Sequence, residues 1–579
     1  MLAASRPWRR REAPGDVIAE LEHDFRMSPL AARLMALRGI TTADADRFLS
    51  RRLADLHRPE LMTGMELAAE RLAEAITARR TILIHGDYDV DGTTASALLA
   101  GFVEACAHRA IAWIPHRRID GYGLSEASLE AARTHHADLL ITVDCGIADH
   151  GWAERIEQAG TTVIVTDHHL KPDNVSGPRC TAVVNPNQPG CPYPDKGLAG
   201  VGVAWKLAWA TAKRLSGSDK VSPRLREYLL DSLALVAVGT LADCAPLTGE
   251  NRVLVHHGLG ALRRTSVPGL RALIEHARLD EDLSASDVGW KISPLLNASG
   301  RVGSAMGTLA LLTAADAEAA RTALAAVVSE NEERRRLTQL LTADLIAAAA
   351  RPEHAGRCAL VFAGDGWHAG VVGIVASRLV ETYQKPAAVI ALADGVGKGS
   401  LRSIAGVNLG ECLAACRPYL LKGGGHAMAA GLSIDPAQVP AFADAFEAAV
   451  RERLPGGGIS PRTDYDADVA MGELDGEFFA VLDRLGPFGN GNPEPMVQVS
   501  GVSIVARPRL FGANADHLKA AITDAGGGMR ELLCWRGKDL FTPFATGGAR
   551  FDLLVRPQAT TFRGQPQTRL VWVDGRSAQ

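Results

Sequence analysis

Three short apolar runs rich in β-branched residues constrain the fold of this chain most strongly. They are TILIH at residues 81–85, LLITV at 139–143 and TTVIV at 161–165. Each run is apolar on both faces, which is typical of central strands in a parallel sheet. Ala-rich amphipathic stretches alternate with the runs up to about Thr240, as expected of βαβ units. The sequence therefore predicts an α/β domain built on a parallel sheet.

Acidic and imidazole side chains follow each predicted strand. HGDYDVDG spans residues 85–92, Asp144 follows the second run, and residues 167–169 are Asp-His-His. Ligands of open α/β sheets bind beyond the carboxyl ends of the strands, so we expect these side chains to meet there. Asp243 follows DSLALVAVGTLA, which we interpret as a buried helix that ends in a loop.

These residues predict a centre that binds two divalent cations. A single Asp after a strand often only caps the next helix, but burying so many like charges without cations would be very costly. Oxygen ligands with a few imidazoles favour Mn²⁺ or Mg²⁺, and the near absence of thiolates argues against structural zinc. Two such cations about 3.5–4 Å apart can activate water and hold a phosphoryl group. We expect Asp144 to bridge them.

Gly-rich segments in the second half of the chain predict a phosphate-binding surface. GWHAGVVGIVASRL begins at Gly366, GKGSLRS at Gly397 and GGGHAMAAG at Gly423. Glycines let backbone amides approach an anion closely, although most Gly-rich turns are only turns. The side chains that can donate to phosphate oxygens are Arg378, Ser400, Arg402 and His426.

Length and local composition predict several domains. The 579 residues exceed a single hydrophobic core. Residues 310–350 have few helix breakers and predict a long connecting helix, Pro455–Gly458 indicates a linker, and β-rich runs near the C-terminus predict a small β-barrel. The predicted segments are an N-terminal helical segment (1–48), a catalytic α/β domain (49–275), a helical connector (276–350), a second α/β domain (351–455) and the barrel (456–579).

Charge and cysteine usage bear on the binding partner and on the cellular compartment. The net charge is −4, but residues 501–579 carry 11 Lys and Arg against 6 Asp and Glu, which suits a phosphate backbone. Residues 456–500 carry 2 against 8, and ordinary surface variation is the alternative explanation. The nine scattered cysteines suit a reducing compartment. No apolar run has membrane-spanning length, so we expect a cytoplasmic protein.

The motifs resemble the DHH phosphoesterase family, named after its third motif, here Asp167, His168 and His169. The resemblance implies that one cation is held by His85, Asp89 and Asp144. It implies a second cation held by Asp91, Asp144, His168 and Asp243, with His169 facing the phosphate. Asp87 is a weaker candidate ligand, because loop geometry must decide where it points. The candidate catalytic residues are Asp91, Asp144 and His169.

The second α/β domain resembles the DHH-associated domain of the same family. Gly423–His426 matches its GGGH motif, His368–Ile374 and Ser400–Arg402 match two further segments, and NASGRVG at 297–303 matches a segment whose Arg contacts substrate phosphate. Together with the phosphate donors named above, these motifs make the candidate substrate-binding residues Arg301, His368, Arg378, Ser400, Arg402, Gly424, Gly425 and His426.

The length, the connector and LGPFGNGNPEP at residues 485–495 are similar to bacterial members of the family that degrade single-stranded DNA. The resemblance implies an exonuclease of recombination and repair that releases mononucleotides in the 5′ to 3′ direction, acts as a monomer, and works with single-stranded-DNA-binding protein and a helicase. The alternatives are an oligoribonucleotide or cyclic-dinucleotide phosphodiesterase and a scaffold without metals. Aromatic residues of the barrel either stack on bases or form its core: Phe488, Phe511, Trp535, Phe541 and Phe544.

Overall fold

The computed structural model describes residues 6–117, 119–172, 175–279, 283–454, 462–546, 548–562 and 565–578. The linker expected at Pro455–Gly458 lies outside these ranges. The chain forms two compact units. The first unit comprises residues 1–293, 311–320 and 461–579, and the second comprises residues 294–310 and 321–460.

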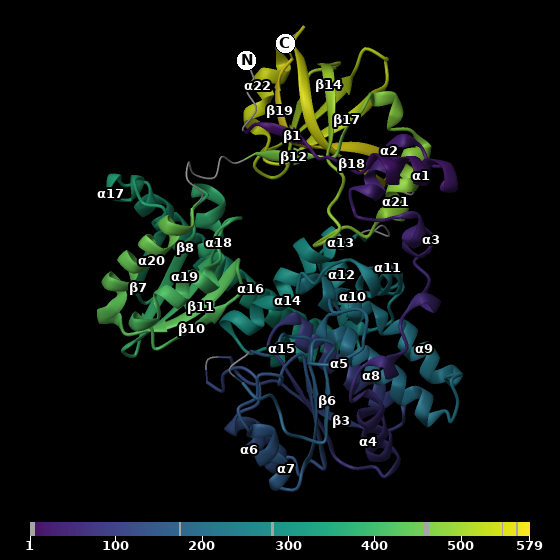
Figure 1. Cartoon of the computed structure of the whole chain (residues 1–579), viewed down its shortest axis with the longest axis vertical. Coiled ribbons are helices and arrows are strands. Elements are labelled where there is room, and N and C mark those ends of the chain that lie inside the picture. Colours follow the sequence, from purple (N-terminus) through teal and green to yellow (C-terminus); the bar gives the residue numbers. More distant parts are fainter. Residues whose placement is uncertain are drawn as a thin grey trace. The chain divides into compact units, whose positions relative to one another are not determined.

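A five-stranded sheet of the first unit carries the predicted strands (Figure 1). Its order is β3-β2-β4-β5-β6, and every neighbouring pair is parallel. All positions of β2 and β4 are buried, as the two-sided apolar pattern predicts. The parallel sheet is thereby confirmed. The strands are β2 (Ile82–Gly86), β3 (Ala110–Trp113), β4 (Leu139–Val143), β5 (Thr162–Thr166) and β6 (Ala182–Val184).

Helices pack on this sheet and beside it. On one face, Leu83, Leu140 and Val163 form a buried cluster with Ala131 of α6 and Ile156 of α7. Helix α10 is apolar and buried from its start to Thr240, and it ends directly before Asp243, as predicted. The helices are α4 (Met65–Thr77), α5 (Val90–Ala105), α6 (Glu126–Thr134), α7 (Trp152–Gln158), α8 (Gly200–Leu215), α9 (Pro223–Asp231), α10 (Leu233–Ala242), α11 (Gly249–Arg263), α12 (Pro268–His276), α13 (Ala285–Asp287) and the π-helix η3 (Val288–Ile292).

The C-terminal part of the first unit is a closed sheet. Its seven strands have the order β13-β14-β18-β19-β17-β16-β15, and a further pairing of β14 with β16 joins the two sides, as expected of a barrel. The elements are β12 (Thr463–Tyr465), β13 (Ala467–Asp468), η6 (Met471–Glu473), α21 (Gly476–Leu485), β14 (Val497–Ile504), β15 (Arg509–Phe511), β16 (His517–Thr523), β17 (Met529–Cys534), η7 (Lys538–Leu540), α22 (Phe541–Ala545), β18 (Arg550–Phe562) and β19 (Gln565–Ser577).

The N-terminal segment belongs structurally with this barrel. Strand β1 pairs in parallel with β12, and Figure 1 shows the two strands side by side. Arg9 and Arg11 form ion pairs with Asp464 and Asp466, so these acids of the approach segment have cationic partners. Leu34 lies in the same buried cluster as strand residues of the barrel. The elements are β1 (Trp8–Arg10), α1 (Gly15–Phe25), α2 (Pro29–Ala36), α3 (Thr42–Ser50), η1 (Leu53–Asp55) and η2 (Pro59–Leu61).

The second unit is an α/β domain with a long helix. Its sheet has the order β10-β11-β9-β8-β7, in which β7 and β8 are parallel and the remaining pairs antiparallel. The long helix predicted over residues 310–350 begins only at Ala317, because the side chain of Asp316 caps it there, and residues 310–312 belong to the preceding helix α15 instead. The elements that lie wholly or mostly in this unit are α14 (Ser293–Val302), α15 (Met306–Leu312), α16 (Ala317–Ala349), α17 (Pro352–Ala355), β7 (Leu360–Asp365), α18 (Val372–Tyr383), β8 (Ala387–Ala393), β9 (Val396–Arg402), α19 (Leu409–Ala415), η4 (Arg417–Tyr419), β10 (Lys422–Gly425), β11 (Ala429–Ile434), η5 (Pro436–Gln438) and α20 (Val439–Arg453).

Among the helices of the described ranges, none combines the length and the apolar character needed to span a membrane.

Candidate active site

The loops after β2, β4 and β5 and the end of α10 bring acidic and imidazole side chains together. In three groups, one potential metal-ligating atom from each member lies within 4.8 Å of the others. The groups are Asp87 with Asp89 and Asp144, Asp91 with His168 and Asp243, and Asp144 with His168 and His169. Asp144 and His168 each occur in two groups, so they lie at the middle of the site.

Asp144 is held in a strained backbone conformation at this central position. Its φ of +63° lies in the left-handed region, which non-glycine residues seldom adopt and which recurs at functional sites. Its Oδ1 lies 3.1 Å from Nε2 of His168. A Cβ at Gly200 would lie 2.5 Å from that Oδ1, so only glycine fits there.

Helix N-termini hold the acids that follow β2. The side chain of Asp89 accepts a hydrogen bond from the backbone N–H of Gly92 and caps α5. Asp91 is buried, and its two oxygens accept from the backbone N–H groups of Gly200 and Val201, at 2.7 and 2.8 Å, where α8 begins. The positive end of the α8 dipole therefore faces the Asp91 carboxylate.

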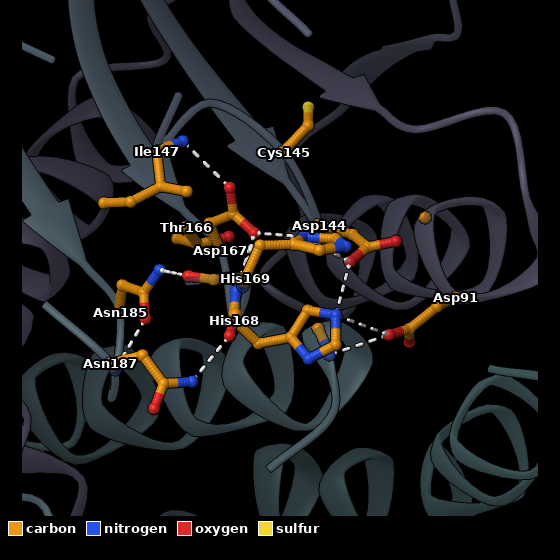
Figure 2. Close-up of polar contacts among 12 residues, drawn as sticks. Asp91, Asp144, Cys145, Ile147, Thr166, Asp167, His168, His169, Asn185 and Asn187 are labelled. Carbon is orange, nitrogen blue, oxygen red and sulfur yellow. Dashed lines mark hydrogen bonds and ion pairs between the residues drawn. The ribbon is translucent and has the colours of Figure 1, made fainter. Parts of the chain in front are cut away.

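Hydrogen bonds with neighbouring polar groups hold the Asp-His-His segment in place, as Figure 2 shows. Asp167 accepts from the backbone N–H groups of Ile147, His168 and His169. It also lies 2.8 Å from Nδ1 of His169, which orients that ring. Asn185 and Asn187 donate to the carbonyls of His169 and His168. Neither asparagine was predicted from the sequence, although the NPN segment directly after β6 is a signal for them.

Burial and mutual repulsion raise the pKa of the clustered carboxyl groups. Burial raises the pKa of Asp87, Asp91 and Asp144 well above the ordinary value, and neighbouring carboxylates raise it further. The same causes raise the pKa of Asp243 to about 7. Such a cluster is stable in its ionised form only when cations neutralise it.

The two histidines of the motif differ in charge. Burial lowers the pKa of His168 to about 4, so its ring is neutral and able to ligate a metal. Burial acts in the same direction on His169, but the hydrogen bond to Asp167 and the attraction of neighbouring carboxylates together outweigh it and raise the pKa of His169 to about 9.

The residues present fit a pair of hard divalent cations. Within the described part of the chain, Oδ1 of Asp87, Oδ1 of Asp144 and Nε2 of His168 are buried and have no hydrogen-bond partner. Unpaired buried polar atoms are rare and call for a bound group. Carboxylate oxygens with one neutral imidazole are the donors that Mn²⁺ and Mg²⁺ prefer.

His85 and Asp87 differ in whether they lie among the clustered metal-ligating atoms. His85 is fully buried, its Nε2 lies 2.9 Å from Oγ of Ser128, and its Nδ1 lies 3.7 Å from Sγ of Cys145. Both ring nitrogens thus face protein groups, and His85 is absent from the three groups found among the described residues. Asp87, the weaker candidate, is present in one of them. The reason is that the chain turns after β2, which alternation along a strand does not describe.

In the second unit, several of the predicted phosphate-binding residues lie close together. Nη1 of Arg301 approaches the carbonyl of Gly370 at 3.5 Å, and Nδ1 of His368 accepts from the N–H of Gly370. A Cβ at Gly373 would lie 3.1 Å from the Arg402 guanidinium and 3.2 Å from Oγ of Ser400.

The other predicted residues of the second unit lie on its surface. Gly424, Gly425 and His426 are exposed at the end of the edge strand β10, where the N–H of His426 donates to the carbonyl of Ala429. Arg378 forms an ion pair with Glu381 on the surface of α18.

The barrel aromatics separate into core and surface residues. Phe544 is 2% exposed, whereas Trp535 is 52% exposed. Trp535 contacts the rings of Phe511 and His517, and the ammonium of Lys519 lies 5.6 Å from the centre of the Phe511 ring. Phe488 and Phe541 are partly buried against the core.

This carboxylate centre on a parallel sheet, accompanied by a glycine-rich second α/β domain and a barrel, defines a multidomain phosphoesterase of the DHH class. Three family models match the chain: the DHH family N-terminal domain over residues 81–240, the DHHA1 domain over 356–452 and the RecJ OB domain over 465–574.

Two relatives and one solved structure identify the family within this class. The chain is 36% identical to the single-stranded-DNA-specific exonuclease RecJ of Salmonella typhimurium, over 90% of this chain and 91% of that protein. It is also 36% identical to the Bacillus subtilis protein of the same name, over 90% of this chain and 65% of that protein. The crystal structure of Thermus thermophilus RecJ in complex with Mn²⁺ superposes with a TM-score of 0.80 at 32% identity, covering 99% of this chain and 80% of that chain. The chain therefore belongs to the RecJ family.

Proposed function

We propose that this protein is a single-stranded-DNA-specific exonuclease that hydrolyses phosphodiester bonds with two divalent cations, Mn²⁺ or Mg²⁺. It releases mononucleotides in the 5′ to 3′ direction and acts in DNA recombination and repair. Relatives that match 90% of the chain are named single-stranded-DNA-specific exonucleases. The observation that carries the proposal is at the centre of a carboxylate cluster, where Oδ1 of Asp144 and Nε2 of His168 are buried and have no hydrogen-bond partner among the described residues.

The proposed ligands follow the groups of adjacent donor atoms. Asp87, Asp89 and Asp144 would hold one cation, and Asp91, Asp144, His168 and Asp243 the other. When bound, the cations supply an activated water and neutralise the charge of the phosphate.

The surrounding side chains orient the reacting groups. Asp167 fixes the ring of His169 through Nδ1, so that Nε2 can donate to a phosphate oxygen and stabilise the charge that develops there. The α8 N-terminus fixes Asp91 through two hydrogen bonds. His169, Asp91 and Asp144 are accordingly our candidate catalytic residues.

Two other parts of the chain are proposed to hold the strand. In the second unit, Arg301, His368, Ser400 and Arg402 can donate to backbone phosphates, and the exposed glycine edge at Gly424 and Gly425 can approach an anion. We leave Arg378 out, because Glu381 already pairs with it. In the barrel, the exposed Trp535 and the half-buried Phe511 and His517 beside it offer a platform for bases.

A phosphodiesterase for oligoribonucleotides or cyclic dinucleotides is the less favoured alternative, since a dinucleotide would not need the barrel. A comparison of substrates tests this. Purified protein with Mn²⁺ is incubated with single-stranded DNA, a blunt duplex, an RNA strand and a dinucleotide. We expect rapid loss of single-stranded DNA alone; cleavage of only the dinucleotide would overturn the proposal.

Single-stranded DNA is the proposed main partner. We also propose single-stranded-DNA-binding protein and a helicase as protein partners, a monomeric state and a cytoplasmic location. Gel filtration coupled to light scattering, with and without the single-stranded-DNA-binding protein, tests the monomer and the first of these partnerships.

A further inference from the structure

The LGPFGNGNPEP segment, residues 485–495, lies between α21 and β14 and has no part in the function proposed above. It folds into a tight loop. The backbones of Gly489 and Asn492 exchange two hydrogen bonds, of 2.9 and 3.1 Å. The buried side-chain amide of Asn492 donates to the carbonyls of Leu485 and Pro487. Asn490 is thereby held at the tip of a braced loop.

The tip of this loop contacts the chain directly after Asp243. The side-chain amide of Asn490 donates to the carbonyl of Cys244 at 2.8 Å. In return, the backbone N–H of Leu247 donates to the carbonyl of Asn490 at 2.7 Å. Asn490 therefore bridges both ends of the turn that follows Asp243.

The glycines beside Asn490 allow this close approach. A Cβ at Gly489 would lie 2.7 Å from Leu247, and Gly491 adopts a φ of +72° with only 3.3 Å between its Cβ position and Thr248. Substituted residues at either position would push the tip away from the turn.

The turn itself needs external support. Cys244 has a φ of +57°, an unfavourable conformation for a non-glycine residue. On the other side, Asn251 donates to the carbonyl of Pro246. Asp243 is the first residue after α10, so the direction of its carboxylate depends on how the chain leaves the helix at Cys244.

We propose that Asn490 is a positioning residue for Asp243. By holding the Cys244 carbonyl, Asn490 keeps the Asp243 carboxylate directed at Asp91 and His168, and the segment before the barrel thus completes the cation site of the α/β domain. The inference rests on the proposed function, because it treats Asp243 as a cation ligand.

The test measures Mn²⁺ binding by the full chain, using the electron paramagnetic resonance signal of free Mn²⁺. The variants are Asn490→Ala, Asn490→Asp, which keeps the shape but removes the amide donor, and Asp243→Ala. Asn514→Ala, at an exposed position of the barrel, is the matched control. Thermal unfolding and circular dichroism of each variant establish that it is folded.

We expect two Mn²⁺ per wild-type chain and per control chain, and one per Asp243→Ala chain. Both Asn490 variants should bind one Mn²⁺ normally and the other about 10-fold more weakly, the effect typical of losing a group that orients a metal ligand. Control-like affinity in Asn490→Asp would overturn the inference while leaving the proposed function intact. Wild-type protein that binds no Mn²⁺ would overturn both.

Discussion

The Nε2 atom of His168 lies 3.1 Å from Oδ1 of Asp144, and in the described chain neither atom has a hydrogen-bond partner. An unpaired buried polar atom costs about 1–3 kcal/mol. We propose that a cation bound by both atoms would recover this loss of stability.

Replacing Asp144 should remove both cations. We expect Asp144→Asn to lower nuclease activity by at least about 100-fold even at saturating Mn²⁺, since a shared ligand supports both ions. The measurement is the rate of nucleotide release from single-stranded DNA. Asp138→Asn, an exposed Asp of the same domain, serves as the control, and full activity in Asp144→Asn would contradict the bridging role.

The raised pKa of Asp243 predicts a pH-dependent stability of the cation-free protein. Its pKa is 3.8 as a reference and about 7 in the folded chain, so the folded state retains a proton that the unfolded state has lost. The stabilisation that the folded state gains from the protonated Asp243 carboxyl is complete below the reference pKa and disappears as the pH rises through 7. In chelator, Asp243→Asn should match wild type at about pH 4 and exceed it in thermal midpoint at about pH 8.

Other groups titrate over the same range, so the comparison is between the two proteins at each pH. The free-energy difference at the higher pH should be on the order of a few kcal/mol. A difference that stays constant with pH would show that burial does not raise this pKa. Excess Mn²⁺ should reverse the order, because wild type then gains a ligand that the variant lacks.

Two aromatic residues of the barrel should respond to substitution in opposite ways. Trp535→Ala should weaken single-stranded DNA binding by about 1–3 kcal/mol for a lost base stack and leave stability nearly unchanged, because the ring is half exposed. Phe544→Ala should instead destabilise the barrel by about 3–5 kcal/mol, because its ring is buried. Fluorescence anisotropy and urea unfolding separate the two effects. Equal DNA affinity of Trp535→Ala and wild type would exclude the platform.

Two arginines of the second unit should also respond differently to substitution. Arg402→Ala should raise the KM for single-stranded DNA by roughly 10-fold or more, the value of one charged hydrogen bond to phosphate. Arg378→Ala should leave KM unchanged, since its guanidinium pairs with Glu381. Steady-state rates at varied DNA concentration provide both numbers, and the reverse ranking would mean that the phosphates run along α18.

The sequence was sufficient for the strands and for most of the acids, because both depend on local patterns. The apolar runs before His85, Asp144 and Asp167 are buried parallel strands, and Asp243 does follow a buried helix. The residue pattern made both His85 and Asp87 candidate ligands, but it could not show where either side chain points. Strand β2 itself places the His85 ring against Ser128 and Cys145, and the loop after the strand places Asp87 beside Asp89 and Asp144.

Long-range pairings were also beyond the sequence. Strand β1 pairs with β12, although Arg9 and Asp464 within these strands are 455 residues apart in the sequence. No local signal marks the two segments as partners. The contact between Asn490 and Cys244 is of the same kind. Sequence periodicity reports which side of an element is buried, but it does not identify the residues that cover it.

We propose that this chain digests single-stranded DNA from its 5′ end with cations bound at the carboxylate cluster. A time course with Mn²⁺ on single-stranded DNA labelled at either the 5′ or the 3′ end tests this proposal. We expect immediate release of labelled mononucleotide from the 5′-labelled strand, a late release from the 3′-labelled strand, and neither with chelator. Immediate release of the 3′ label, or digestion that persists in chelator, would contradict it.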